Sequence, residues 1–306
     1  MRVLVTGATG FIGSRLIPEL LTKGVTVRAL TRNPSRFSAP SGVEVAQGDV
    51  LDRASLTGAL KDVDAAYYFV HSMSKDTRGT GLSFDERDRL AARNFVEAAG
   101  EQGVGRIIYL GGLGEEQVEL SQHLQSRAEV GQILASGQPA LTTLRAALII
   151  GAGGASYEML RYLTERLPIM IAPKWLETRS QPIAVRDAVA YLVGCLLDDR
   201  TAGRVFDIGG PDIVTYRQLI KIYGDLRGLK RLIIGVPVLT PRLSSYWVKL
   251  VTPVSLDLVK PLIEGLKNEM ICHEDSIGAL ITFERTPIRE AIRLALTEPR
   301  PSSIKA

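Results

Sequence analysis

The sequence predicts an α/β fold in which a doubly wound parallel sheet is followed by a smaller, mostly helical C-terminal lobe. The chain opens with an apolar strand, Val3–Val5, that runs into a glycine-rich turn and then into a helical pattern over residues 14–23. Strand and helix patterns alternate through the first half of the chain at the spacing of βαβ units. Several of these strands are almost continuously apolar, as in parallel sheets that helices cover on both faces.

The elements of the first half follow one another with short connections. The expected strands are Val3–Val5, Val25–Leu30, Val43–Gln47, Ala65–Val70, Arg106–Leu110 and Leu141–Leu144. The expected helices between them are Ser14–Lys23, Ala54–Leu60, Phe84–Gln102 and Ser121–Ala135. Because connections between parallel strands are right-handed, this alternation predicts a doubly wound sheet with helices on both faces.

The regular alternation of strand and helix patterns ends after Gly151, which indicates a second lobe. The expected helices are Ser156–Leu167, Asp187–Leu197 and Thr215–Gly224, and the expected strand is Arg204–Gly209. Thr215 has the residue type of a helix N-cap, whose hydroxyl accepts a hydrogen bond from the first turn.

The end of this alternation also suggests a division of the chain into domains. We assign residues 1–150 to the sheet domain, with 180–210 returning to it, and residues 151–179 and 211–306 to the C-terminal lobe. Within that lobe Leu232–Leu266 is apolar and broken by prolines. Such a segment can roof a hydrophobic substrate pocket, lie on a membrane surface or close the core, although charges interrupt it too often for a clean interfacial helix.

Composition narrows the classes of protein to consider. Of 306 residues 45% are apolar, and the net charge of +4 is spread along the chain, which gives a nucleic-acid-binding function little support. The chain has two cysteines, and they lack C-x-x-C spacing, which argues against structural disulfides and zinc sites. This cysteine usage favours a reducing cytoplasm. No targeting segment is recognised at the start. No uncharged apolar run reaches the length of about 18 residues that predicts a transmembrane segment, which leaves weak peripheral membrane contact as an option.

The glycine-rich turn predicts a dinucleotide site. Glycine is needed where a turn is tight, where backbone approaches a pyrophosphate and where helix packs against strand. The helix that follows presents N–H groups and a positive dipole end to that phosphate. The residues expected to bind the cofactor here are Gly7, Thr9, Gly10, Phe11, Ile12 and Gly13. The alternative is a turn that serves only close packing.

The residues after the next strands favour NADP(H), with NAD(H) possible. Sites for NAD usually place an acidic residue after the second strand, whereas an arginine accommodates a 2′-phosphate. Arg32 and Arg36 follow that strand with no acidic residue near them, so Arg32 is the expected phosphate ligand. After the third strand, Asp49 and Val50 are expected to hold adenine. Val70 and His71, after the fourth strand, complete the cofactor set.

These residues resemble the short-chain dehydrogenase/reductase superfamily, and more narrowly its atypical, NmrA-like NAD(P)H-binding branch, which includes nucleoside-diphosphate-sugar epimerase-like proteins. The superfamily motifs are Thr6–Gly13, Gly48–Val50, Leu144–Gly151 and Gln181–Asp187. The motifs typical of the branch are Tyr67–Met73, Tyr109–Gly114 and Phe206–Pro211. The resemblance covers about residues 1–225 and implies a Rossmann-type fold that binds NAD(P)H, with a C-terminal substrate lobe.

The sequence departs from the catalytic pattern that the resemblance implies. The superfamily has a serine after the fifth strand and a tyrosine followed four residues later by lysine. Here Gly111-Gly112 stands in place of the serine, and His123 and Arg127 occupy the helical spacing of the pair. Arg127 can bind the nicotinamide ribose but stays charged, because a guanidinium does not lose its proton in proteins.

Two histidines are therefore catalytic candidates, with Arg127 as their partner. His123 could orient or protonate a substrate, since imidazole titrates near neutral pH. His71, at the carboxyl edge of the sheet, is the second candidate. The alternatives are that His123 is an exposed helical residue and that His71 only positions the cofactor.

Further polar residues are expected to border a substrate. They are Arg145, Tyr157, Arg179 and Gln181. Arg145 is equally suited to tying loops together. His123, Glu129 and His273 do not have the spacing of metal ligands, so no metal is expected.

The function predicted from the sequence is an NADP(H)-dependent oxidoreductase of the atypical short-chain type that acts on a small, largely apolar substrate. The alternative is a non-catalytic NADP(H)-binding redox sensor or assembly protein, which the missing serine and tyrosine favour. A sugar-nucleotide epimerase is the weaker third choice, because its tyrosine-dependent proton transfer has no matching residue.

Overall fold

A computed structural model describes residues 1–71, 81–114, 122–172, 174–235 and 268–299. In this part of the chain a seven-stranded parallel sheet has the order β11-β6-β5-β4-β1-β2-β3. Its strands are β1 (Arg2–Val5), β2 (Thr26–Thr31), β3 (Val43–Gln47), β4 (Ala65–Tyr68), β5 (Arg106–Gly112), β6 (Ala140–Ala146) and β11 (Val205–Ile208). The predicted α/β fold with a Rossmann-type doubly wound sheet is confirmed, and the predicted strands agree to within two residues at each end.

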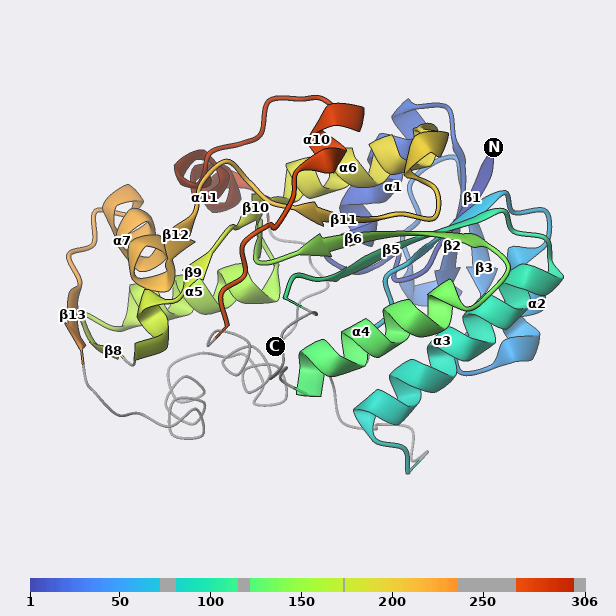
Figure 1. Cartoon of the computed structure of the whole chain (residues 1–306), viewed down its shortest axis with the longest axis horizontal. Helices are drawn as coiled ribbons and strands as arrows, with labels where there is room; N and C mark the ends of the chain where they lie inside the picture. The colour runs from blue at the N-terminus through green and yellow to red at the C-terminus, as the bar shows by residue number, and fades with distance from the viewer. Residues whose placement is uncertain (72–80, 115–121, 173, 236–267, 300–306) are drawn as a thin grey trace.

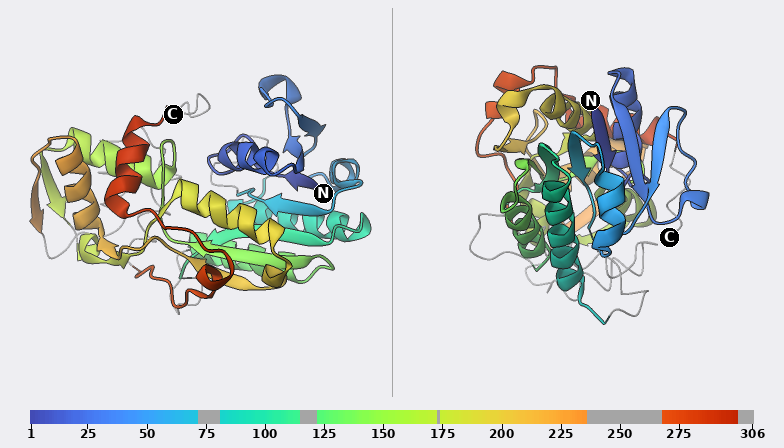
Figure 2. Two further views of the ribbon diagram at one scale, coloured as in Figure 1. Left: turned by 90° about the horizontal axis from the view of Figure 1, so that it is seen from above. Right: turned by 90° about the vertical axis from the view of Figure 1, so that its right-hand side faces the viewer.

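Helices cover both faces of this sheet, as Figures 1 and 2 show. The helices on one face are α1 (Gly13–Thr22) and α6 (Val185–Leu197); those on the other are α2 (Arg53–Leu60), α3 (Phe84–Glu101) and α4 (Gln122–Ala135). Each face has its own apolar core: Leu16 and Ile17 of α1 are buried in one, and Phe95 of α3 in the other. The alternation of strand and amphipathic helix thus produces two helical layers around one sheet.

The C-terminal half packs helices against short strand pairs at the left of Figure 1. Its helices there are α5 (Ala155–Arg166), α7 (Tyr216–Leu226) and α11 (Ile288–Thr297), whereas α10 (Ser276–Leu280) packs on the large sheet beside β11. The short strands are β7 (Ile149–Ile150), β8 (Ile169–Ala172), β9 (Arg179–Ser180), β10 (Ile183–Ala184), β12 (Val214–Thr215) and β13 (Leu232–Gly235). They pair as β7 with β10, β8 with β13 and β9 with β12. The remaining 3₁₀ turns are η1 (Pro34–Arg36), η2 (Lys174–Glu177) and η3 (Asp199–Thr201).

The predicted N-cap of α7 is confirmed. Thr215 accepts a hydrogen bond from the backbone of Gln218, and the side chain of Gln218 accepts one from the backbone N–H of Thr215. This capping box satisfies N–H groups that the first turn of a helix otherwise leaves unpaired. It fixes the start of α7 beside the cavity described below.

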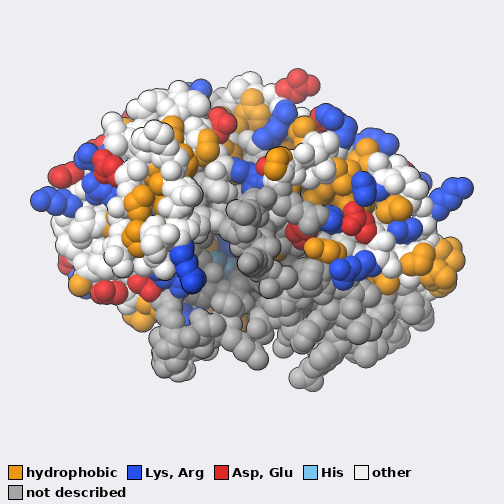
Figure 3. Space-filling model, turned by 180° about the vertical axis from the view of Figure 1, so that it is seen from behind, with side chains coloured by type: hydrophobic (Ala, Val, Ile, Leu, Met, Phe, Trp, Pro, Cys, Tyr) orange, Lys and Arg blue, Asp and Glu red, His pale blue; other side chains and the backbone are white. Residues whose placement is uncertain are grey.

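The segment expected to roof a substrate pocket is described only in part. Residues 232–235 form β13, and residues 236–266 lie outside the described part of the chain. Among the described residues no helix has both the length and the apolarity needed to cross a membrane. On the face shown in Figure 3, Lys and Arg side chains are interspersed with Asp and Glu.

Candidate active site

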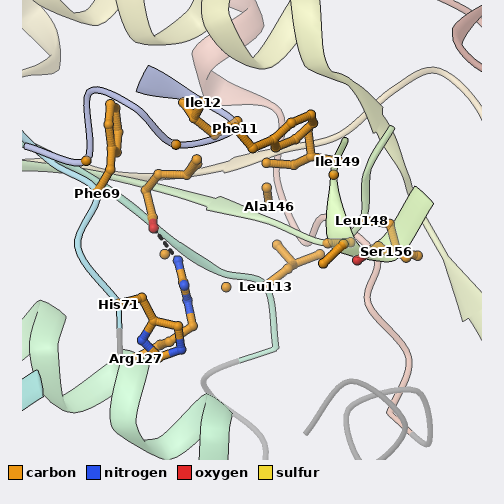
Figure 4. Close-up of a pocket in the computed structure, with 18 of the residues that line it drawn as sticks. Phe11, Ile12, Phe69, His71, Leu113, Arg127, Ala146, Leu148, Ile149 and Ser156 are labelled. Carbon is orange, nitrogen blue, oxygen red and sulfur yellow. Dashed lines mark hydrogen bonds between the residues drawn. The ribbon is translucent and has the colours of Figure 1, made fainter. Parts of the chain in front are cut away.

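The candidate site is a cavity of about 380 Å³ at the carboxyl edge of the sheet. It lies beside β1, from which the strand order runs through β2 in one direction and through β4 in the other. Ligands of doubly wound sheets bind at the point where the strand order reverses in this way. The predicted residues that line it are Gly7, Gly10, Phe11, Ile12, Gly13, Val70, His71 and Arg127. Figure 3 shows the hollow between the two halves of the molecule, and Figure 4 shows its lining.

The glycine-rich turn is held in a shape that side chains would block. Gly7 has a φ of +62°, a left-handed conformation that favours glycine, and its carbonyl accepts a hydrogen bond from Gly10 N at 2.9 Å. A Cβ on Gly13 would stand 2.4 Å from the carbonyl oxygen of Gly7 and 2.9 Å from Cα of Ala8. The first turn of α1 is therefore packed directly on the backbone of the turn.

This packing leaves donors for an anion. The backbone N–H groups of Phe11 and Ile12 donate to no protein group in the described part of the chain. Ile12, the N-cap residue of α1, has no side chain that could cap the helix. Unpaired N–H groups and the positive end of a helix dipole together make an anion site. The cradle therefore has the shape and the donors that a pyrophosphate requires.

Arg127 approaches the cavity from α4. Its guanidinium donates a hydrogen bond to the carbonyl oxygen of Leu110, at the end of β5, which Figure 4 marks with a dashed line. The guanidinium carbon lies 5.9 Å from the centre of the Tyr109 ring, and the Tyr109 hydroxyl donates to the carbonyl of Arg127 at 3.1 Å. These contacts fix a permanent positive charge beside β5, next to His71 (Figure 4).

His71 is paired with a buried carboxylate. Its Nδ1 lies 2.6 Å from Oδ2 of Asp88, whose side chain is 1% exposed. The Ser126 hydroxyl donates to the same oxygen at 3.4 Å. A carboxylate beside Nδ1 fixes the tautomer of the neutral imidazole, with its N–H on Nδ1.

The surroundings of His71 favour its neutral form. Burial lowers the pKa of His71 below its ordinary value, and the positive charge of Arg127 lowers it further. The hydrogen bond and negative charge of Asp88 raise the same pKa but do not outweigh the burial. At neutral pH His71 therefore carries a lone pair on Nε2, and it becomes an acid only when it takes up a proton.

The residues predicted to hold the adenosine half lie along the same edge but do not line this cavity. Arg32 is exposed at the end of β2 and makes no hydrogen bond or ion pair with the described residues. After β3, Asp49 accepts a hydrogen bond from Leu51 N at 3.1 Å, and Val50 is buried. Thr9 is exposed in the glycine turn.

The four predicted substrate residues lie outside the lining of the cavity. Arg145 forms an ion pair of 2.7 Å with buried Asp207. Tyr157 is 1% exposed in the core of the C-terminal half. Arg179 pairs with Glu269 on the surface, and Gln181 donates to the carbonyl of Gly210 at 2.9 Å. Their contact with a substrate stays a prediction.

His123 lies in the first turn of α4, as expected from its spacing to Arg127. Its side chain is outside the described part of the chain. The catalytic role predicted for it therefore remains untested by the geometry.

The partner of His71 is the main residue that sequence analysis missed. Asp88 shares one face of α3 with Ala91, Ala92 and Phe95, which are all buried. A carboxylate on the apolar stripe of a helix is a recognisable signal, because such a group is rarely buried without a partner. Apolar residues that were not predicted also line the cavity, among them Leu148, Met159 and Met270.

Comparison with known proteins identifies an NAD(P)H-binding family. A family model described as NAD(P)H-binding matches residues 7–161, just over half of the chain. Over 231 residues the chain is 24% identical to the mitochondrial NADH dehydrogenase (ubiquinone) 1 alpha subcomplex subunit 9 of Arabidopsis thaliana. That match covers 72% of this chain and 57% of the Arabidopsis protein, so it spans less than two thirds of that relative.

A second relative and one solved structure are reductases by name. The chain is 28% identical over 224 residues to the (4-alkanoyl-5-oxo-2,5-dihydrofuran-3-yl)methyl phosphate reductase of Streptomyces griseus, covering 71% of this chain and 70% of that protein. The structure is an NADPH-dependent quinone oxidoreductase of Escherichia coli complexed with NADPH, with a TM-score of 0.76 and 22% identity. It covers 96% of this chain and 100% of that one, which shows a shared fold.

Proposed function

The chain belongs to the NAD(P)H-binding family, and on that premise we propose that it is an NADP(H)-dependent oxidoreductase that reduces a small, largely apolar acceptor. One observation carries the proposal: the glycine cradle, Arg127 and the His71–Asp88 pair meet around a single apolar-walled cavity. A phosphate site, a fixed cation and a group that can exchange a proton are the parts that hydride transfer to a polar double bond requires. A cytoplasmic location belongs to the same proposal.

The cradle fits the pyrophosphate of the coenzyme. The N–H groups of Phe11 and Ile12 would donate to its oxygens, and the close packing of Gly13 on the backbone of Gly7 and Ala8 holds these donors in place. The adenosine half would then extend over β2 and β3, where Arg32 binds the 2′-phosphate. The nicotinamide half would lie over β4 to β6, where Arg127 holds its ribose. Bound there, NADPH supplies the hydride.

His71 supplies the proton. As hydride adds to an electrophilic carbon of the acceptor, protonated His71 would donate the proton on Nε2 to the acceptor atom that gains the electron pair. His71 would then be reprotonated from solvent. Asp88 takes no part in bond making; it holds the ring and stabilises the imidazolium before transfer. The reaction thus consumes one NADPH and one proton for each acceptor.

The names of two similar proteins support an electrophilic acceptor. One is called an (alkanoyl-oxo-dihydrofuranyl)methyl phosphate reductase, whose substrate also carries a charged phosphate, and one a quinone oxidoreductase. The cavity walls agree with that class, since Phe69, Leu113, Leu148 and Met159 contribute apolar side chains. Apolar walls with a few placed polar groups are typical of sites that bind small organic molecules.

The second candidate function is NADP(H) binding without turnover, in a sensor or an assembly subunit. Two observations favour it. Gly111 and Gly112 end β5 where the superfamily has its serine, and one relative is named as a subunit of a larger assembly. This alternative shares the coenzyme site and differs in having no acceptor.

Turnover separates the two functions. We expect the purified protein to oxidise NADPH in the presence of at least one class among quinones, enones, aldehydes and imines, measured by the loss of NADPH absorbance. A matched reaction without acceptor is the control for slow oxidation by oxygen. Tight NADPH binding with no turnover on any class would overturn the reductase proposal and support the sensor.

Arg32→Ala is expected to change the choice of coenzyme. Loss of a hydrogen bond to a charged group costs about 1.5–3 kcal/mol, so the preference for NADPH over NADH should fall about tenfold to a hundredfold. Titration of both coenzymes against both proteins measures the ratio. Arg289→Ala on α11 removes an exposed arginine remote from β2 and should leave the ratio unchanged. A ratio that Arg32→Ala also leaves unchanged sinks the phosphate assignment.

A further inference from the structure

A second cavity adjoins the candidate active site inside the C-terminal half. It has a volume of about 40 Å³ and shares four lining residues with the main cavity: Leu148, Ser156, Met159 and Tyr216. The two spaces therefore adjoin at these four residues. The smaller one reaches into the lobe, between α5 and α7.

The walls of this side cavity are almost entirely apolar. Beyond the shared residues they comprise Ile150, Leu160, Leu163, Met170, Trp175, Leu176, Leu219 and Ile220. A water needs two to four polar partners, and the polar side-chain atoms of these walls are confined to Ser156, Tyr216 and Trp175. The space therefore suits a group that is largely apolar.

The position of the side cavity suggests which group that is. Its walls belong to the core of the C-terminal half, where close packing is the rule and an empty space forfeits dispersion contacts on every side. The void lies where this core meets the main cavity, at the end over β6, toward which the nicotinamide half of the coenzyme would point. A ligand reduced there would have the four shared residues within reach of a substituent that points into the lobe.

We propose that the side cavity binds a short alkyl substituent of the hydride acceptor, and so selects acceptors that carry a chain of about three carbons on an electrophilic ring. The inference rests on the proposed function for the identity of the ligand as an acceptor. The length follows from the volume, which holds roughly three water-sized units. Longer chains require the walls to move, and shorter ones leave the space unfilled.

The first test uses 1,4-benzoquinones with a methyl, ethyl, propyl or pentyl group at position 2. Each methylene that leaves water for the cavity contributes about 0.8 kcal/mol, so KM should fall roughly fourfold per carbon up to propyl and rise again for pentyl. A KM that does not depend on chain length overturns the inference.

A substitution on the wall provides the second test. Leu163→Phe adds atoms to a residue that lines the side cavity alone, and Leu296→Phe makes the same change in the same core, at a residue that lines neither cavity. We expect Leu163→Phe to remove the dependence of KM on chain length and Leu296→Phe to keep it. Melting temperature and NADPH affinity, measured for both variants, show that each is folded. Equal behaviour of the two variants contradicts the inference.

A binding measurement separates this inference from the reductase function. Trp175 lies on the wall of the side cavity, and the other tryptophan is Trp247, so a Trp247→Phe background leaves Trp175 as the only emitter. The redox-inert probe n-propylbenzene should shift its emission saturably, and Leu163→Phe should weaken that binding at least tenfold. Binding of the probe without turnover of any quinone supports the side cavity and overturns the reductase proposal. Absence of binding overturns the side cavity, whatever the turnover.

Discussion

Gly13→Ala is expected to abolish NADPH binding while the protein stays folded. The added Cβ would stand 2.4 Å from the carbonyl oxygen of Gly7 and 2.9 Å from Cα of Ala8, and both of these are backbone atoms that no rotamer change can move away. The start of α1 must therefore shift away from the turn, which misplaces the N–H groups of Phe11 and Ile12. Because binding depends on several of these donors together, we expect the affinity to fall at least about a hundredfold.

The control for this variant is another glycine in the same domain. An added Cβ on Gly58, within α2, meets nothing within 4 Å, and alanine is the better helix former, so Gly58→Ala should keep both stability and NADPH affinity. Calorimetric titration measures the affinity of both variants, and circular dichroism checks their fold. An affinity of Gly13→Ala within threefold of wild type would show that the turn does not hold the coenzyme.

His71→Asn is expected to lower kcat about 10²- to 10⁴-fold, the usual contribution of a positioned acid or base, with little change in NADPH affinity. The asparagine amide can still donate to Asp88, so the carboxylate keeps a partner, but no proton donor remains at the position of Nε2. Stopped-flow measurement of NADPH oxidation with the best acceptor of the panel gives kcat. An unchanged kcat would leave His71 with a positioning role only.

The same role for His71 predicts how the rate of reduction changes with pH. Burial lowers the pKa of His71, so the acid form that donates the proton accumulates only as pH falls below the ordinary value of about 6.5. Reduction should therefore accelerate toward acidic pH in the wild type and lose that dependence in His71→Asn. Asp88→Asn removes a charge that raises the pKa of His71, so its acid limb should move to still lower pH. A structural role for Asp88 would change stability without moving that limb.

Many of the helices and strands could be predicted because local sequence patterns determine where they begin and end. The apolar runs and helical periods give β3 with its ends and α3 to within one residue, and Thr215 gives the start of α7. The strands of two residues in the C-terminal half escaped prediction, since so short a strand shows no period. They form because the chain is held against neighbouring segments there.

The candidate site likewise contains residues that the sequence could assign and residues that it could not. The residues of the glycine turn are close in sequence, so local backbone conformation brings them together. Gly7 and Gly13 could therefore be assigned from their spacing alone. Tyr157 has the same residue type as a substrate ligand, yet the turn of α5 directs its ring into the lobe core. Nothing in the sequence around Tyr157 tells which side of α5 faces the cavity.

The sequence by itself determined a strand, a turn and a helix shaped for a pyrophosphate, and the alternation of strands and helices that builds a doubly wound parallel sheet. Only the tertiary structure decided the spatial order of the strands, that Asp88 of α3 lies 2.6 Å from His71, that Arg127 stands beside them, and that a largely apolar side cavity adjoins the site. The physical reason is that hydrogen bonding and side-chain period are set by neighbours along the chain. The meeting of side chains from different helices depends on how each helix is rotated and placed on the sheet, which the packing of the whole core sets.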